Sequence, residues 1–118
     1  MKRRFIESRE FTRRFEVLRM AGELTDDDLA TLQLLLLENP EAGDLVQGSG
    51  GVRKVRMALP ARGRGKSYGV RALVLDLAKR GHTHLLTLFG KNESADLSPL
   101  GKKLVRQLVE AIKKESKS

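Results

Sequence analysis

The stretch VRKVRMAL, residues 52–59, marks the point at which the chain changes from helical spacing to the alternation of a strand. Because successive side chains of a strand point to opposite faces, one face of this predicted strand is aliphatic and the other is cationic. The aliphatic face carries Val55, Met57 and Leu59, and the cationic face carries Lys54 and Arg56. The stretch therefore predicts a sheet that packs inward on one side and offers a platform for phosphate groups on the other.

Before this stretch, the spacing of apolar residues predicts a short strand and two helices. The strand is expected in RRFIES, residues 3–8, and the first helix is expected to end near Gly22. Thr25 is a good N-cap for the second helix, because Asp26–Asp28 then lie where the helix dipole favours negative charge. That helix is expected to end at Asn39-Pro40. The predicted core-facing residues of the two helices are Phe11, Phe15 and Leu18, then Leu29, Leu32, Leu35 and Leu36.

After this stretch, two further strands and a closing helix are expected. YGVRALVLDL, residues 68–77, is typical of a mostly buried strand, and KRGHT, residues 79–83, of a turn. The continuous apolar character of HLLTLFG, residues 84–90, favours a central position in the sheet. Ser98 can cap the last helix and Pro99 can take its first position. Its predicted apolar face carries Leu100, Leu104, Leu108 and Ile112. The result is one α+β domain over the whole chain: N-terminal helices packed on an antiparallel sheet, and a C-terminal helix.

The composition is that of a folded and strongly basic protein. A chain of 118 residues suits one domain, and 40% hydrophobic with 32% charged residues suits a globular protein. Because there is no cysteine, neither a disulfide framework nor a thiolate metal site is expected. The longest apolar run, LQLLLLENP, is too short to span a bilayer. No apolar stretch follows the basic N-terminus, so we expect no secretory signal and take the cytoplasm as the location.

The positive charge is concentrated in one part of the chain. The net charge is +8, and no aspartate or glutamate occurs between Leu45 and Leu75. That interval holds seven cations: Arg53, Lys54, Arg56, Arg62, Arg64, Lys66 and Arg71. They would repel one another on folding unless they met acids from elsewhere in the fold or an anionic ligand. We favour the anionic ligand, and a basic balance of this kind fits a polyanion such as RNA.

The segment ARGRGKSYG, residues 61–69, contains GRGKS and at first suggests a phosphate-binding loop for a nucleotide. That motif requires a glycine five positions before Gly65, where this chain has Pro60, which has no backbone N–H to donate. The alternating charge before it is also unlike the apolar strand that normally precedes such a loop. We therefore interpret the segment as a cationic loop that holds RNA backbone without reading its sequence.

Cationic side chains are sufficient, in chemical terms, to cut RNA. The RNA 2′-hydroxyl is an internal nucleophile, so a protein needs only to align it, remove its proton and stabilise the charge on phosphorus. Arginine suits the last of these tasks, and a lysine crowded by cations loses its proton more easily. Lys54 lies between Arg53 and Arg56 in the sequence. His82 and His84 would share a face if they lay on a strand, but we expect them to be surface residues of the predicted turn. No histidine pair has metal-ligand spacing, and neither a metal nor a cofactor is expected.

Four segments resemble the HigB branch of the RelE-type toxins, and they occur in the same order over nearly the whole chain. These are NPEAGDLVQGSGGVRKVR (39–56), GRGKSYGVR (63–71), LLTLFGKNESADLS (85–98) and the helix behind them. The parts 48–56 and 90–97 are the most specific. The resemblance implies a microbial-ribonuclease-like α+β fold and the toxin of a type II toxin–antitoxin system, a metal-independent endoribonuclease (mRNA interferase). It further implies cleavage of mRNA on the ribosome, and a HigA-like antitoxin with a helix-turn-helix domain that brings the pair to operator DNA.

The resemblance also implies roles for individual residues. Lys54 and Arg56 match the paired basic residues of a strand, Arg71 matches the transition-state arginine, and Lys91 in FGKNE matches a basic position after the last strand. These four form the expected catalytic set. The expected RNA-binding set is Arg53, Arg62, Arg64, Lys66, Tyr68, Phe89 and Asn92.

The chain departs from the family pattern in ways that leave alternatives open. Leu75-Asp76 stand where an aromatic pair is usual, and Phe89 stands where a tyrosine is common. A catalytically degenerate binding protein of the same fold is therefore one alternative. A ParE-like toxin directed at gyrase is another. A basic DNA-binding domain is a weaker one, because the charge is predicted on strands and loops and no helix-turn-helix spacing is found.

Overall fold

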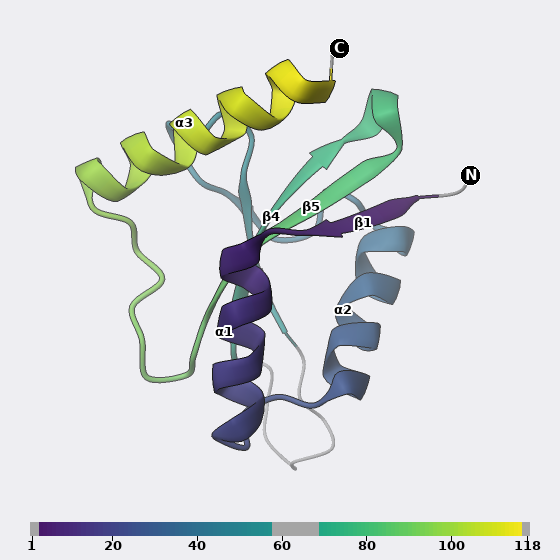
Figure 1. Ribbon diagram of the computed structural model, residues 1–118, viewed down its shortest axis with the longest axis vertical. Helices are drawn as coiled ribbons and strands as arrows, with labels where there is room; N and C mark the ends of the chain where they lie inside the picture. Colours follow the sequence, from purple (N-terminus) through teal and green to yellow (C-terminus); the bar gives the residue numbers. More distant parts are fainter. Residues whose placement is uncertain (1–2, 58–68, 117–118) are drawn as a thin grey trace.

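The computed structural model describes residues 3–57 and 69–116 and has the expected α+β class. A five-stranded sheet of order β1-β5-β4-β3-β2 separates α1 and α2 on one side from α3 on the other (Figure 1). The elements are β1 (Arg4–Glu7), α1 (Arg9–Met20), α2 (Asp26–Glu38), β2 (Asp44–Leu45), β3 (Arg53–Arg56), β4 (Arg71–Leu77), η3 (Ala78–Arg80), β5 (His82–Phe89) and α3 (Pro99–Ser116).

The sheet is mixed rather than purely antiparallel. β3 pairs antiparallel with β2 and β4, and β4 pairs antiparallel with β5. β1, however, runs parallel to β5, so the expectation of an antiparallel sheet is wrong at this edge. The connection explains the difference, because α1 and α2 carry the chain from β1 across one face before the remaining strands form. β5, predicted to be central, has a neighbour on both sides, but it is next to the edge strand β1 and the central place belongs to β4.

The caps of the first two helices follow local sequence chemistry. The Ser8 hydroxyl accepts from the Phe11 N–H at 3.0 Å and so caps α1. Thr25 and Asp28 form a capping box at α2: the Asp28 N–H donates to Thr25 Oγ1 at 3.2 Å and the Thr25 N–H donates to Asp28 Oδ2 at 2.9 Å. The predicted N-cap at Thr25 is therefore confirmed.

The core beneath α1 and α2 contains most of the residues predicted for it. Phe11, Phe15 and Leu18 are buried, and Leu32 and Leu36 are buried against the same side of the sheet. Leu29 packs at the margin of this cluster. Leu35 is 39% exposed, so its predicted core position is wrong. It lies about 100° around the helix from Leu36, outside the stripe that faces the sheet.

The helix α3 covers the opposite face, and it does so with a different side from the one predicted. Val109 is buried, and Val105 and Ile112 pack beside it on the sheet. Leu100, Leu104 and Leu108 are instead 65%, 56% and 41% exposed. The helix carries two apolar rows, and the row that includes the β-branched residues contacts the sheet. The prediction is thus right for Ile112 and wrong for the three leucines. The predicted start is confirmed, because α3 begins at Pro99 and the Gly101 N–H donates to Ser98 Oγ at 3.0 Å.

Among residues 3–57 and 69–116, none of the helices is long and apolar enough to cross a membrane.

Candidate RNA-binding face

The register of the sheet places three predicted site residues in one row. Arg56 lies directly opposite Arg71 across β3 and β4, and Arg71 lies directly opposite Phe89 across β4 and β5. Opposed residues of neighbouring strands share a face, so this row lies on the α3 side of the sheet. Lys54 is on the same face because it is two residues before Arg56 and opposes Leu73, a member of the α3-side core. The predicted cationic face of β3 is confirmed.

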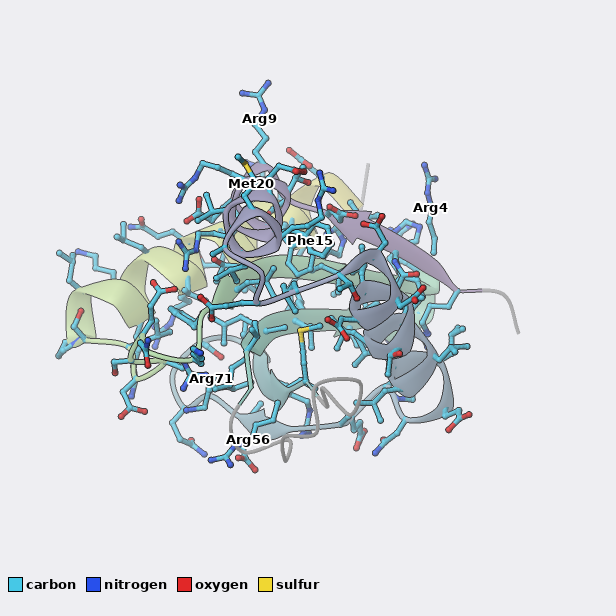
Figure 2. All side chains as sticks on the ribbon, turned by 90° about the horizontal axis from the view of Figure 1, so that it is seen from below. Arg4, Arg9, Phe15, Met20, Arg56 and Arg71 are labelled. Carbon is cyan, nitrogen blue, oxygen red and sulfur yellow. The ribbon has the colours of Figure 1, made fainter. Side chains whose placement is uncertain are left out.

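Arg56 and Arg71 have different surroundings. Arg56 is exposed and makes no ion pair with any residue in the described part of the chain. Arg71 is half-buried, and its Nη2 donates to the Gly90 carbonyl at 2.6 Å and to the Glu93 carbonyl. Its Nε is buried and has no hydrogen-bond partner among the described residues. The two arginines lie near one another in Figure 2, on the side of the molecule away from Arg9.

Arg71 organises the loop that follows β5. Arg71 bonds the carbonyls of Gly90 and Glu93 in this loop. A backbone bond closes the same loop, since the Glu93 N–H donates to the Gly90 carbonyl at 3.0 Å. Glu93 also pairs with Arg14 of α1, which fixes the loop to the body of the domain. The loop carries Lys91 and Asn92, which are both exposed and lie in the chain between the two residues whose carbonyls Arg71 bonds.

Lys54 has an acidic neighbour that the sequence did not indicate. Its Nζ lies 3.4 Å from Asp96 Oδ1, and the Asp96 side chain is 91% exposed. The crowding argument for Lys54 considered only Arg53 and Arg56, whereas the structure adds a contact with an acid. Nothing in the local spacing indicates this contact, since it joins residues 42 positions apart.

Arg53 is not brought to the face that holds Lys54 and Arg56. It opposes Val74, which belongs to the core under α1 and α2, and its Nη1 donates to the Gly43 carbonyl at 3.2 Å. Gly43 is a second residue that sequence spacing did not single out. Its φ is +87°, and a Cβ there would lie 2.3 Å from the Lys54 carbonyl oxygen. Only glycine therefore lets this turn approach the backbone of β3.

The positions that depart from the family pattern have structural roles. Phe89 is half-buried and packs against the α3-side core, which limits how much of its ring can stack on a base. Leu75 is buried in that core. Asp76 pairs with Arg3 and accepts from Thr83 Oγ1 at 3.1 Å. Asp76 is five residues along β4 from Arg71, a distance of about 16 Å. Neither Leu75 nor Asp76 therefore reaches the row that contains Arg71.

The turn predicted for residues 79–83 is confirmed as far as Gly81, but the histidines are not surface residues of that turn. η3 and Gly81 make the turn, and both His82 and His84 lie on β5 and are half-buried. Their ring centroids are 6.2 Å apart in an edge-to-face arrangement, and His84 Nε2 is buried without a hydrogen-bond partner in the described residues. Burial lowers the pKa of His84, and its neighbour His82 lowers it further. His84 opposes Leu75, so the pair lies at the other end of the sheet from Arg71.

Some predicted residues lie outside the described residues. These are Arg62, Arg64, Lys66 and Tyr68 of the basic loop, together with Leu59 of the predicted strand. The described ends of that segment meet beside the row, since the Met57 N–H donates to the Val70 carbonyl at 2.9 Å.

In residues 3–57 and 69–116, no group of three or more histidine, aspartate or glutamate side chains is arranged to hold a metal ion. A scan of the chain against protein-family models finds no match.

Proposed function

We propose that this protein is a HigB-like toxin of the RelE type, an endoribonuclease that cuts mRNA on the ribosome in the cytoplasm. The observation that supports this most is the row in which Arg56 opposes Arg71, with Lys54 on the same face of the sheet. Two like charges directly opposite each other destabilise a sheet. A scissile phosphate between them would remove that repulsion.

In the proposed reaction, the RNA 2′-oxygen loses its proton and attacks the adjacent phosphorus. The bond from phosphorus to the 5′-oxygen then breaks, and this oxygen takes up a proton, which leaves a 2′,3′-cyclic phosphate. Arg56, which is exposed, holds the phosphate. Arg71 stabilises the additional negative charge on the phosphorane oxygens. Lys54, once it has left Asp96 and given up one proton to solvent, is a neutral amine that accepts the proton of the 2′-hydroxyl, and the Lys91 ammonium supplies the proton to the leaving oxygen.

The proposed partner is a HigA-like antitoxin whose helix-turn-helix domain binds operator DNA. A protein with a net charge of +8 requires an acidic complement to mask it, so the toxin-binding segment of the antitoxin should be acidic.

A reconstituted translation system tests the activity. Primer extension on a translated mRNA should reveal cuts only when both ribosomes and the protein are present. Arg71→Ala and Arg56→Ala should each reduce cutting by about a hundredfold or more. Lys79→Ala with Arg80→Ala is the matched control, since both residues are exposed cations of η3 and lie away from the row. If Arg71→Ala and Arg56→Ala cut mRNA as well as this control does, the catalytic roles assigned to the two arginines are wrong.

A second candidate function is an RNA-binding protein of the same fold that has lost catalysis. It is favoured by Leu75 and Phe89, which pack in the core where the family pattern has aromatic residues. Folded protein that binds RNA but produces no cuts, with or without ribosomes, would support this candidate over the first.

A further inference from the structure

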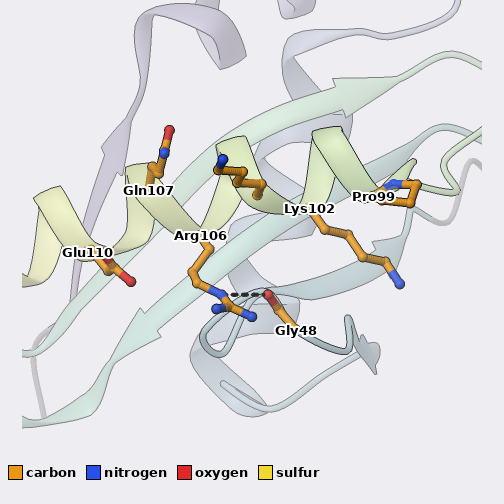
Figure 3. A pocket seen from close by; sticks show the side chains of 7 residues that line it. Gly48, Pro99, Lys102, Arg106, Gln107 and Glu110 are labelled. Carbon is orange, nitrogen blue, oxygen red and sulfur yellow. Dashed lines mark hydrogen bonds between the residues drawn. The ribbon is translucent and has the colours of Figure 1, made fainter.

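A cationic groove runs along α3, outside the row formed by Arg56 and Arg71. It has a volume of about 460 Å³ and lies between the helix and the loop that carries Gly48 (Figure 3). Its lining is Gly48, Pro99, Lys102, Lys103, Arg106, Gln107 and Glu110. Among the described residues that line the groove, Pro99 is the only one with an apolar side chain, so the groove suits a polar ligand better than an apolar helix.

The groove has an excess of positive charge that the described protein does not neutralise. Glu110 is the one acid among the described lining residues, and none of Lys102, Lys103 and Arg106 makes an ion pair in the described part of the chain. Arg106 uses Nε to donate to the Gly48 carbonyl at 3.1 Å. The other four N–H groups of its guanidinium remain for a ligand, and their planar fork matches two phosphate oxygens.

The cations of α3 form a row rather than a single cluster. Lys102, Arg106 and Lys113 fall within about 40° of one another around the helix, and Figure 3 shows Lys102 and Arg106 extending from the same side of it. Lys113 Nζ donates to the Gly50 carbonyl at 3.1 Å. Over these eleven positions the helix rises about 16 Å. A row of this length suits consecutive phosphates of a chain better than one small anion.

The groove adjoins the candidate site at Lys102. This lysine also lines a second pocket of about 330 Å³, whose lining includes Lys54. Both pockets lie on the α3 side of the sheet. Asp44 and Asp96 line the second pocket too, and their carboxylates disfavour a phosphate at its centre. Lys102 is therefore the residue at which an extended ligand would pass from one pocket to the next.

We propose that this groove binds the phosphate backbone of single-stranded RNA adjacent to the segment held at Arg56 and Arg71. This inference rests on the proposed function, because it extends the same substrate beyond the row. Lys102 and Arg106 are the principal phosphate ligands, and Lys103 and Lys113 strengthen the field around them. The contacts are to the backbone, so they add affinity without sequence preference.

Binding of uncleavable RNA tests the proposal directly. The probes are fluorescent 2′-O-methyl RNAs of about four and about twelve nucleotides, measured by anisotropy against salt concentration. The test variant is Lys102→Gln with Arg106→Gln, and the charge-matched control is Lys79→Gln with Arg80→Gln. For the longer RNA we expect the test variant to bind about tenfold more weakly than the control. Its salt slope should fall by about 1.4, which is the loss of two phosphate contacts. The shorter RNA should bind both variants alike.

Each outcome decides between the readings. Equal binding of the longer RNA by the test variant and the control overturns the proposal. Equal RNA binding, combined with weaker binding of polyglutamate by the test variant, also overturns it and assigns the groove to an acidic protein. A loss of long-RNA affinity in a protein that never cuts mRNA supports the groove while the nuclease assignment fails. If Arg106→Gln prevents folding, Lys102→Glu alone keeps the bond from Arg106 to Gly48 and should still weaken binding of the longer RNA.

Discussion

Arg56 and Arg71 lie directly opposite each other on the neighbouring strands β3 and β4. Proteins seldom place like charges in this relationship without a compensating anion, because the pair is destabilising. Arg71 is held by the carbonyls of Gly90 and Glu93, which offset part of its charge, whereas Arg56 has no comparable contact among the described residues.

Removing the charge of Arg56 should make the protein more stable while it weakens RNA binding. We expect Arg56→Gln to raise the free energy of unfolding by about 0.5 kcal/mol in low salt, and by less in high salt, where the repulsion is screened. Urea denaturation at two ionic strengths measures this, with Arg4→Gln on β1 as the control. A stability that falls at low salt would show that Arg56 is balanced by the protein itself.

The contact between Lys54 and Asp96 predicts that the acid competes with RNA for the lysine. Asp96→Asn should tighten binding of uncleavable RNA by about threefold, because the ammonium no longer has a carboxylate partner. Its effect on stability should be small, since the Asp96 side chain is 91% exposed. Anisotropy titrations of Asp96→Asn and of Glu41→Gln, an exposed acid elsewhere, make the comparison. The same gain in both variants would mean that only net charge matters.

Gly43 should be intolerant of any side chain because of its place against β3. Gly43→Ala should lower the free energy of unfolding by about 3 kcal/mol, since φ is +87° and the new Cβ would lie 2.3 Å from the Lys54 carbonyl oxygen. Gly22→Ala is a matched control: φ is +77°, but no atom lies within 4 Å of the new Cβ. It should cost only about 1 kcal/mol, the strain of the backbone alone. Equal costs in urea denaturation would show that the close approach is not rigid.

Local patterns predicted the elements that local chemistry determines. Alternation between residues 52 and 57 gave the two faces of β3, and the spacing of Thr25 and Asp28 gave the start of α2. Both depend on residues a few positions apart. The mixed pairing of β1 depends on how the chain crosses the sheet, and the alternation within one strand does not contain that information.

The errors arose where two local solutions were equally good. α3 has an apolar row that includes Leu104 and another that includes Val109, and only the shape of the sheet selects between them.

The contact of Lys54 with Asp96, and the pocket that Lys102 and Lys54 both line, join residues more than 40 positions apart. No periodicity within one segment reports such contacts. Of the candidate site, the sequence therefore predicted the cations but not the acids and turns that surround them.

Two matched substitutions test which side of α3 faces the sheet. Val109→Ala should lower the free energy of unfolding by about 2 kcal/mol, because Val109 is 1% exposed and its side chain fills the core. Leu104→Ala should change it by no more than about 0.5 kcal/mol, because Leu104 is 56% exposed. Chemical denaturation of both variants under the same conditions compares the two sides. A larger loss for Leu104→Ala would restore the orientation expected from the sequence.

His84 should make the fold sensitive to mild acid. Burial lowers the pKa of His84 from 6.5, His82 lowers it further, and Glu115 of α3 opposes them. Since its pKa is lower in the folded state, the unfolded chain binds the proton more tightly, and protonation favours unfolding. The contribution of His84 is therefore complete above pH 6.5 and is lost as the pH falls from there through the folded pKa. Urea denaturation between about pH 5 and pH 8 should show this decline in the wild-type protein. The decline should be much shallower in His84→Gln, and His82→Gln should reduce it only partly. An unchanged slope in His84→Gln would place the acid-sensitive group elsewhere.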